Sequence, residues 1–330
     1  MAPSGSLSSP DLSGRSIGSR SIGSNVKISI VTPSFNYARW LPDTLDSVAG
    51  QSDRGVEHVV VDDGSTDSSW DVLAAYSKPL VLHRQPNRGL SETLNQALRL
   101  ATGDWFGWLN ADDFYLPGAL AMVRRAIEAY PNADMIWGDC VYIDAQGRFL
   151  RLVAQHPTNR RVLRLMGTHI APCAMFVRRA ALPSWMFDSR LQVAQDWDLS
   201  LALLHAGSRM IWLPTPLGAF RRHEHQHGRP APVEEHNHVR RRYGLATNLT
   251  LRRWANRYGM LEHALHKTIV GSYRRQSRTA LFAGQDMRWF ASSPALAIVN
   301  RIVYEASDTR VRQWLTAASL TEPGLVTNSQ

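Results

Sequence analysis

Acidic residues occur in two adjacent pairs, and each pair follows a short apolar segment of the chain. Asp62-Asp63 comes directly after Val56–Val61, and Asp112-Asp113 comes shortly after Trp105–Leu109. Carboxylates that converge in one cleft repel one another unless a cation or hydrogen-bond donors compensate their charge. Mg²⁺ and Mn²⁺ take oxygen ligands and keep coordination positions for substrate phosphates. The two pairs therefore indicate a divalent-metal site that is suited to a diphosphate.

Each pair taken alone also has a purely structural explanation. Asp62-Asp63-Gly64-Ser65 is typical of an Asx-rich turn before a helix, for which Asp67 is a good N-cap. Asp112-Asp113 is equally compatible with a loop before a helix that Pro117 initiates. The choice depends on whether the fold brings the pairs together.

The elements that must position these residues alternate between strand and helix. Strands are predicted at 27–31, 56–61, 80–83 and 105–109, and helices at 38–49, 68–76, 90–100 and 117–130. Such alternation with short connections predicts an α/β fold with a mixed, mostly parallel sheet and helices on both faces. Right-handed crossovers place the carboxyl ends of parallel strands along one edge, where ligands bind.

That edge collects the residues whose chemistry is of interest. Each predicted strand is followed by a polar segment: Thr32-Pro33-Ser34-Phe35-Asn36, Asp62-Asp63, Asn87-Arg88-Gly89 and Asp112-Asp113. Because all four segments occur at strand ends in this order, one shared site is favoured over four unrelated turns.

The second half of the chain is expected to supply an acceptor site. Strands are predicted at 135–137, 140–143, 149–153, 170–177 and 210–213, with a helix at 193–205. Asp196 and Asp198 lie near the first turn of that helix, where the helix dipole stabilises a carboxylate by roughly 0.3–1 kcal/mol. That stabilisation is the structural explanation for both residues.

Residues 26 to about 225 resemble glycosyltransferase family 2, a family of inverting enzymes with the GT-A fold. The resemblance rests on Thr32-Pro33-Ser34-Phe35-Asn36, Val61–Asp67, Asn87-Arg88-Gly89, Trp108–Asp113 and Gln195–Leu199. It implies a transferase that moves a sugar from a nucleotide-diphosphate sugar to a hydroxyl. Within 26–228, it implies a nucleotide-sugar-binding half (26–115) and an acceptor and catalytic half (116–228).

The resemblance also implies roles for individual residues. The expected nucleotide-sugar ligands are Pro33, Ser34, Phe35, Asn36, Asp62, Asp63, Asn87, Arg88, Gly89, Asn110, Ala111 and Asp112. The family's Asp-x-Asp element is Asn110-Ala111-Asp112 here, so its first carboxylate is missing. Asp112 and Asp113 are expected to share the ribose and metal roles, in an order that the sequence leaves open. The implied cofactor is Mn²⁺ or Mg²⁺.

Two further assignments come from the same resemblance. Asp196 occupies the position of the family's catalytic base, with Gln195 in place of the first acid of the usual pair. A carboxylate there would accept the proton of the acceptor hydroxyl. Phe220, Arg221, His223 and Gln226 match a Phe-Arg-x-His-x-x-Gln pattern, which places His223 beside the diphosphate or its metal.

The implied donor is a nucleotide sugar, with a UDP-sugar favoured. The implied acceptor hydroxyl belongs to a lipid-linked carrier or a growing glycan, in polysaccharide, cell-envelope or glycolipid biosynthesis. Two alternatives remain open: a nucleotidyltransferase, and a protein that binds nucleotide sugars without transferring them. The first would carry a Gly-rich basic loop after its first strand, and Thr32–Asn36 has neither glycine nor lysine.

Composition limits the remaining possibilities. Two cysteines among 330 residues are too few for a disulfide framework, which favours reduced thiols in a cytoplasmic protein. The net charge of +9 favours an anionic partner, and the absence of any recognised nucleic-acid module argues against nucleic acid. Residues 1–25, rich in Ser and Gly, are expected to be a disordered tail.

The region 229–330 is predicted to be helical and basic. Between His238 and Arg278 it carries ten basic residues against the single acid Glu262, with apolar residues interleaved. One interpretation is helices packed on the catalytic domain with a solvated basic face. The other is attachment to an anionic membrane, peripheral at its inner face.

Overall fold

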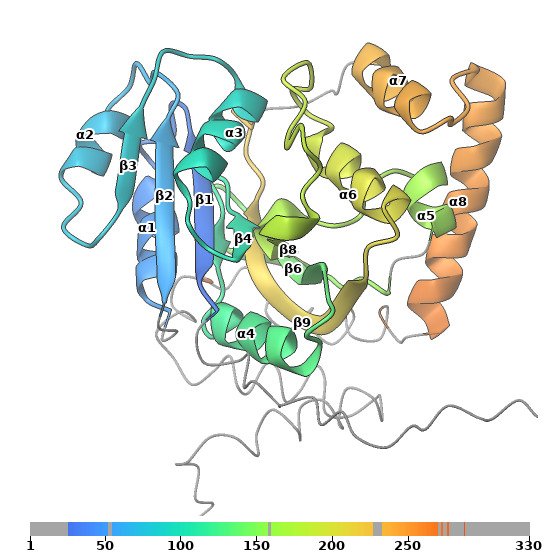
Figure 1. Ribbon diagram of the computed structural model, residues 1–330, viewed down its shortest axis with the longest axis horizontal. Helices are drawn as coiled ribbons and strands as arrows, with labels where there is room; N and C mark the ends of the chain where they lie inside the picture. Colours follow the sequence, from blue (N-terminus) through green and yellow to red (C-terminus); the bar gives the residue numbers. More distant parts are fainter. Residues whose placement is uncertain are drawn as a thin grey trace, which may run out of the picture.

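One mixed sheet organises the fold of the chain (Figure 1). The computed structural model describes residues 26–51, 55–157, 160–226 and 233–269, with the single positions 272, 276 and 287. The strands follow the order β3-β2-β1-β4-β8-β6-β9-β5, and β7 pairs with β6 at the side. The tail predicted at 1–25 lies outside the described residues.

The first half is the parallel part of the sheet. Its elements are β1 (Ile28–Ser34), α1 (Leu41–Ala49), β2 (Val56–Asp62), α2 (Ser69–Ala74), β3 (Val81–Arg84), α3 (Leu90–Leu100) and β4 (Trp105–Trp108). β1 pairs in parallel with β2 and β4, and β2 pairs in parallel with β3. The predicted α/β alternation is therefore confirmed. β1 is longer than expected, because its pairing with β2 continues to Ser34, opposite Asp62.

The second half closes the sheet with mainly antiparallel strands. Its elements are β5 (Phe114–Tyr115), α4 (Ala119–Ala129), β6 (Met135–Ile143), β7 (Phe149–Val153), α5 (Arg160–Leu165), β8 (Met175–Arg178), α6 (Gln195–His205) and β9 (Met210–Arg221). The strands expected at 135–137 and 140–143 are the single strand β6. Most of the strand expected at 170–177 is replaced by a turn and a 3₁₀ helix, so only β8 remains.

β9 is much longer than the strand expected at 210–213. Pro214 and Pro216 would normally end a strand, but the β6–β9 register shifts around Asp139 and accommodates them. Gly138 makes the irregularity possible, because a Cβ there would lie 2.6 Å from the carbonyl oxygen of Thr215. The extension matters because it carries β9 on to Arg221.

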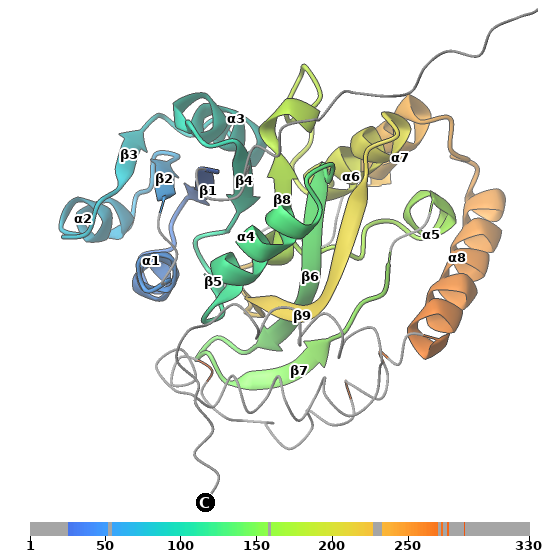
Figure 2. The same cartoon turned by 60° about the horizontal axis from the view of Figure 1, so that its bottom comes forward.

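Different helices cover the two faces of the sheet (Figure 2). On one face Val31 of β1 lies in a cluster with Leu94 of α3 and Leu199 of α6. On the other face Ile30 lies in a cluster with Leu120 of α4. Every residue of β1 is buried, as expected for a strand covered on both sides.

The predicted helical C-terminal region is represented by α7 (Val233–Arg242) and α8 (Leu249–Ile269). α7 lies beside α6, and α8 packs on α5 (Figure 1). A group of histidines helps to fix α8: Nε2 of His156 lies 2.7 Å from Nδ1 of His263, and His169 and His266 stack on His156. Burial lowers the pKa of His156 to about 4, so this contact is made by uncharged rings at neutral pH.

Many of the basic residues in this region face the protein. Arg240 and Lys267 are buried, and Arg242 forms ion pairs with Asp188 and Asp198. A fully solvated basic face therefore does not describe α7. Arg274, Arg275 and Arg278 lie outside the described residues.

Candidate active site

A cavity of about 490 Å³ opens at the carboxyl edge of the parallel strands. It is lined by residues of β1 and the loop after it, the loops after β2, β3 and β4, the start of α6 and the end of β9. Of the residues predicted from the sequence, it brings together Pro33, Ser34, Phe35, Asp63, Asn87, Gly89, Asn110, Asp112 and Asp196. Separate turns that only cap the following helices therefore do not explain why these residues line one cavity.

The end of β1 forms one wall of this cavity. Pro33, Ser34 and Phe35 line it, and the Ser34 hydroxyl is buried without a hydrogen-bond partner in the described part of the chain. Asn36 does not line the cavity. Its backbone has a positive φ of 59°, and its side-chain oxygen accepts hydrogen bonds from the backbone amides of Thr66 and Asp67. Asn36 thus holds the loop that follows β2.

The two aspartates after β2 have different surroundings. Asp63 lines the cavity and accepts hydrogen bonds from the backbone amides of Arg88 (2.9 Å) and Gly89 (2.8 Å), so it shapes the loop after β3. Asp62 is fully buried beneath it and pairs with Nε of Arg84 at 3.1 Å. Gly64, which follows Asp63, lies against the loop after β3. The position requires glycine, because its φ is 74° and a Cβ there would lie 2.8 Å from the backbone nitrogen of Asn87.

The two aspartates after β4, Asp112 and Asp113, also have different surroundings. Asp112 lines the cavity, and its Oδ2 lies 3.0 Å from Nε2 of His223. Asp113 is completely buried away from the cavity, where it accepts a hydrogen bond from the backbone amide of Arg221 at 2.9 Å. Burial, and then the charge of Asp112, raises the pKa of Asp113 well above its usual range.

Of the remaining predicted ligands, Ala111 and Arg88 lie outside the cavity lining. Ala111 is buried against α1, and its carbonyl oxygen accepts a hydrogen bond from the Thr44 hydroxyl. The Arg88 side chain is exposed to solvent. Asn110 does line the cavity, and its side-chain oxygen accepts a hydrogen bond from the indole of Trp108.

His223 is held by a polar contact with Asp112 and by packing of its ring against Trp40. Its side chain is 2% exposed and its ring lies over Trp40, with ring centroids 4.0 Å apart. The side chains of His223 and Asp112 offer one imidazole nitrogen and one carboxylate oxygen, a donor set that fits Mn²⁺. Nδ1 of His223 is buried without a partner in the described residues. Within those residues no three His, Cys, Asp or Glu side chains gather into a complete metal site. Asp112 and His223 would therefore supply only part of the ligands of a bound cation.

Asp196 is a further carboxylate in the lining of the cavity, together with Asp63 and Asp112. It is half-buried at the first turn of α6, where its Oδ1 accepts a hydrogen bond from the backbone amide of Trp197. Burial raises the pKa of Asp196 to about 7. Asp198 points elsewhere and pairs with Arg242. A carboxylate whose pKa lies near neutrality is suited to accepting a proton.

Arg221 fixes the segment that carries Asp112. It is buried, and its guanidinium donates hydrogen bonds to the Asp112 carbonyl (2.8 Å), the Ala145 carbonyl (3.2 Å) and the Asp43 carboxylate (2.8 Å). Sequence reasoning noted Arg221 only as part of a pattern. The sequence also did not indicate several other residues of the lining: Tyr37, Leu90, Thr93, Trp108, Pro172, Gln192, Val193, Phe220 and Gln226. Three of them, Trp108, Phe220 and Gln226, belong to motifs that are recognisable in the sequence.

Comparisons with known proteins agree on one class. The profile of glycosyl transferase family 2 matches residues 29–184. A PGL/p-HBAD biosynthesis glycosyltransferase of Mycobacterium tuberculosis is 31% identical over 179 residues, which cover 52% of this chain and 68% of that protein. An uncharacterized glycosyltransferase of Rickettsia felis is 28% identical over 187 residues, which cover 54% of this chain and 31% of that protein.

A solved structure supports the fold. S. aureus TarS, in a structure with UDP-GlcNAc, superposes with a TM-score of 0.56 at 19% identity, covering 87% of this chain and 83% of that one. The predicted GT-A fold is thereby confirmed. The chain belongs to glycosyltransferase family 2, and it is an enzyme of the transferase class.

Replacement of Arg221 tests its structural role. Arg221→Met keeps a long side chain but removes the guanidinium that donates to two carbonyl oxygens and to the Asp43 carboxylate, which is 24% exposed. The free energy of unfolding, measured with urea, should fall by about 2–4 kcal/mol, because the carbonyl oxygens lose a buried donor while solvent offsets part of the loss at Asp43. The matched control is Arg222→Met at the residue that follows β9, where the guanidinium lies 5.2 Å from the Tyr142 ring centroid and the loss should stay below about 1 kcal/mol. Equal losses in the two variants would contradict the role given to Arg221.

Proposed function

We propose that this protein is an inverting glycosyltransferase that transfers a sugar from a nucleotide-diphosphate sugar to a hydroxyl group. The observation that carries the proposal is the presence of two carboxylates in the lining of one cavity: Asp196, whose pKa is raised to about 7, and Asp112, which is paired with His223. The first suits a general base and the second suits a diphosphate and its cation.

In this proposal the donor occupies the side of the cavity formed by the ends of the parallel strands. Pro33, Ser34 and Phe35 border the nucleotide, and the loop shaped by Asp63 lies beside it. The buried Ser34 hydroxyl is free to pair with a ligand, which would remove an unpaired polar atom. A UDP-sugar is favoured, and the likeness of the fold to TarS with UDP-GlcNAc agrees with this choice.

The chemical step is a direct displacement at the anomeric carbon. The acceptor oxygen forms a bond to that carbon, its proton passes to a carboxylate oxygen of Asp196, and the bond to the diphosphate breaks with inversion. Asp112 and His223 would hold Mn²⁺ or Mg²⁺, which supplies positive charge next to the leaving diphosphate. Asp113 and Arg221 hold the segment in place from behind.

We propose an acceptor in cell-envelope glycolipid or polysaccharide biosynthesis, on a lipid-linked carrier or a growing glycan. The name of the mycobacterial relative, which refers to PGL/p-HBAD biosynthesis, supports this class. The described residues contain no helix that is long and apolar enough to cross a bilayer. We propose attachment to a membrane surface.

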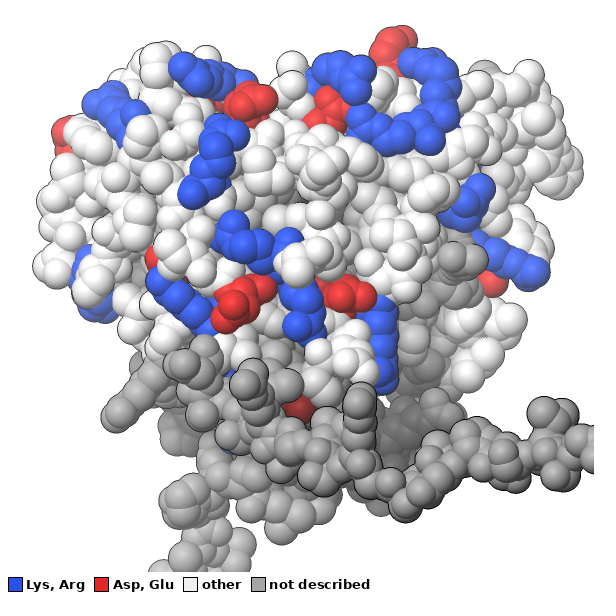
Figure 3. Space-filling view, viewed as in Figure 1, with Lys and Arg blue, Asp and Glu red and all other residues white. Residues whose placement is uncertain are grey.

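The first turn of α8 begins an exposed apolar stripe that suits such a surface. Its members recur every three or four residues, and each is more than half exposed: Leu251, Trp254, Tyr258, Leu261, Leu265 and Ile269. Arg253 and Arg257 are also exposed on this helix. Figure 3 shows Lys or Arg side chains among uncharged residues on the right-hand side of the molecule, where α8 lies in Figure 1. Apolar and aromatic side chains flanked by arginines favour an anionic bilayer surface.

The role of Asp196 separates a transferase from a binding protein. Asp196→Asn keeps the size of the side chain and removes the proton acceptor, so kcat should fall by ~10²–10⁴-fold while donor affinity is nearly unchanged. In the parent protein the rate should also fall as the pH drops below about 7, because Asp196 is then protonated. Steady-state kinetics with a panel of acceptors and calorimetric binding of the donor provide both measurements.

The matched control is Asp71→Asn, an exposed carboxylate in the first turn of α2, which should leave the rate unchanged. A folded Asp196→Asn protein with near-normal transfer would move the base elsewhere. A parent protein that binds donor but transfers to no acceptor would favour the alternative of a nucleotide-sugar-binding protein.

Metal dependence should appear in binding as well as in turnover. Chelation should abolish activity, and Mn²⁺ or Mg²⁺ should restore it. Calorimetric binding of UDP should strengthen when Mn²⁺ is added, and Asp112→Asn and His223→Gln should each lose at least roughly tenfold of that effect. His225→Gln is the control, because His225 is exposed two residues away. Full activity in excess chelator would contradict the proposed site.

Binding to membranes should depend on the stripe. The parent protein should co-sediment with vesicles containing anionic lipid and dissociate as salt rises, because exposed charges are screened over ~8–10 Å. Trp254→Ser with Leu261→Ser should weaken that binding, and Met260→Ser should not, because Met260 is equally exposed but lies off the stripe. Equal binding to neutral vesicles would argue against an anionic bilayer as the partner of the stripe. A dimer in solution that the double substitution dissociates would indicate a second copy of the chain as the partner.

A further inference from the structure

α7 makes direct contact with the start of the helix that carries Asp196. The Glu235 carboxylate accepts hydrogen bonds from the backbone amides of Val193 (2.7 Å) and Ala194 (2.5 Å). Ala194, the N-cap residue of α6, offers no side-chain cap of its own. Unpaired amides at the start of a helix need an acceptor, and a carboxylate is favoured there. Glu235 is therefore a cap supplied from 41 residues further along the chain.

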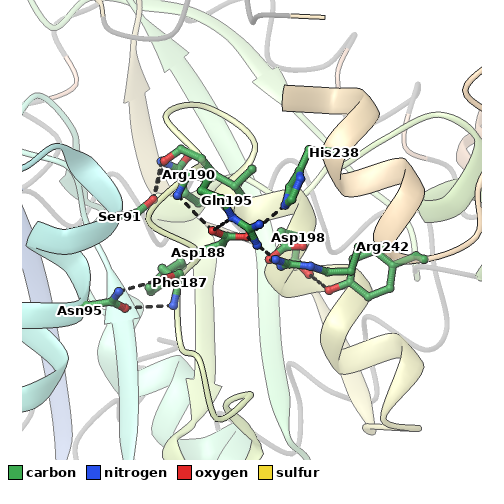
Figure 4. Close-up of polar contacts among 11 residues, drawn as sticks. Ser91, Asn95, Phe187, Asp188, Arg190, Gln195, Asp198, His238 and Arg242 are labelled. Carbon is green, nitrogen blue, oxygen red and sulfur yellow. Dashed lines mark hydrogen bonds and ion pairs between the residues drawn. The ribbon is translucent and has the colours of Figure 1, made fainter. Parts of the chain in front are cut away.

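A network of ion pairs holds α7 in this position (Figure 4). Asp188, in the loop before α6, accepts hydrogen bonds from Arg242 and from His238 of α7. Arg242 also donates to the Asp198 carboxylate at 2.7 Å, so it bridges the loop and α6. The Arg240 guanidinium lies 5.4 Å from the ring centroid of Trp197.

The same loop is tied to the donor side of the cavity. Asn95 of α3 exchanges two hydrogen bonds of 2.9 Å with the backbone of Phe187, and Ser91 donates to the Leu191 carbonyl. Gln195 donates to both Ser91 and Leu191 (Figure 4). The start of α6 is thus clamped between α3 and α7, and its position is set from both sides.

We infer that α7 is a positioning element of the transfer site, in which Glu235 fixes the first turn of α6 and so the location and charge environment of Asp196. The inference rests on the proposed function, because it needs Asp196 as the base. Val193 and Asp196 both line the cavity, whereas Glu235 is buried behind them. Glu235 therefore acts through the helix and through its charge, and it does not touch substrate.

The negative charge of Glu235 has a measurable consequence. Burial is the main cause of the raised pKa of Asp196, and the nearby charge of Glu235 adds to it. A second carboxylate disfavours ionisation of the first. Removing only that charge should lower the pKa of Asp196, so the base would stay ionised at lower pH.

Two substitutions at Glu235 separate position from charge. Glu235→Gln keeps an acceptor oxygen and removes the charge. The acid limb of its kcat/KM profile should move to lower pH by roughly half to one unit, which raises activity at pH 6, relative to its own maximum, about three- to fivefold. Glu235→Ala also removes the acceptor, so kcat should fall roughly 10–100-fold across the profile as Asp196 shifts. Glu234→Gln, an exposed neighbour on α7, should match the parent protein.

The outcomes distinguish this inference from the proposed function. If Asp196→Asn is inactive but both Glu235 variants keep the parent profile, α7 has no positioning role and the base assignment stands. If Glu235→Gln only lowers the rate with its acid limb unmoved, Glu235 is a structural cap and the inference is overturned. If Asp196→Asn retains transfer, both fall. Should Glu235→Ala fail to fold, Glu235→Gln alone decides, because it preserves the cap.

Discussion

The site depends first on a buried arginine. Arg221 ends β9 and reaches three segments that are distant in sequence, through the Asp112 carbonyl, the Ala145 carbonyl and the Asp43 carboxylate. Its own backbone amide donates to Asp113. A planar guanidinium with several donors can hold such a junction, whereas the single ammonium of lysine could not match the geometry. Desolvating this charge is costly, and the surrounding carboxylates and carbonyls offset the cost.

Arg221 explains why adjacent acids take different roles. The turn after β4 is fixed by Asp113, which faces Arg221, and this orientation turns Asp112 toward the cavity and His223. The pair after β2 divides in a similar way, with Asp62 held by Arg84 and Asp63 facing the loop at Gly89. In each pair only one carboxylate lines the cavity, and Asp63 does so while it also holds the loop after β3. Repulsion among the acids is reduced because they are not all directed into one space.

Local patterns were enough to predict the parallel half of the sheet. The strands at 56–61 and 105–109 and the helix at 90–100 have clear periodicity, and the rule for parallel sheets placed their loops at one edge. The length of β9 was not predictable in this way, because Pro214 and Pro216 signal a break that the irregular pairing with β6 removes.

The different roles of neighbouring residues within one motif could not be predicted from the sequence either. Nothing in Asn110-Ala111-Asp112-Asp113 distinguishes the residue that faces the cavity from the one that faces Arg221, because tertiary contacts decide it. A run of basic residues such as Arg240–Arg242 looks like a solvated face, and its partners Asp188 and Asp198 lie more than 40 residues earlier. Contacts over such separations leave no periodic signal in the sequence.

The two sides of the cavity are consequently built in different ways. The proposed donor side lies within the part that the family profile matches, 29–184, and consists of strand ends joined by short loops. The wall that carries Asp196 begins after that part, and its first turn takes its cap from α7. Changes in α7 can therefore move or retune Asp196 while leaving Pro33–Phe35 and Asp63 in place. The boundary predicted between 228 and 229 separates Asp196 from Glu235, although Glu235 accepts hydrogen bonds from the backbone at the start of the helix that carries Asp196.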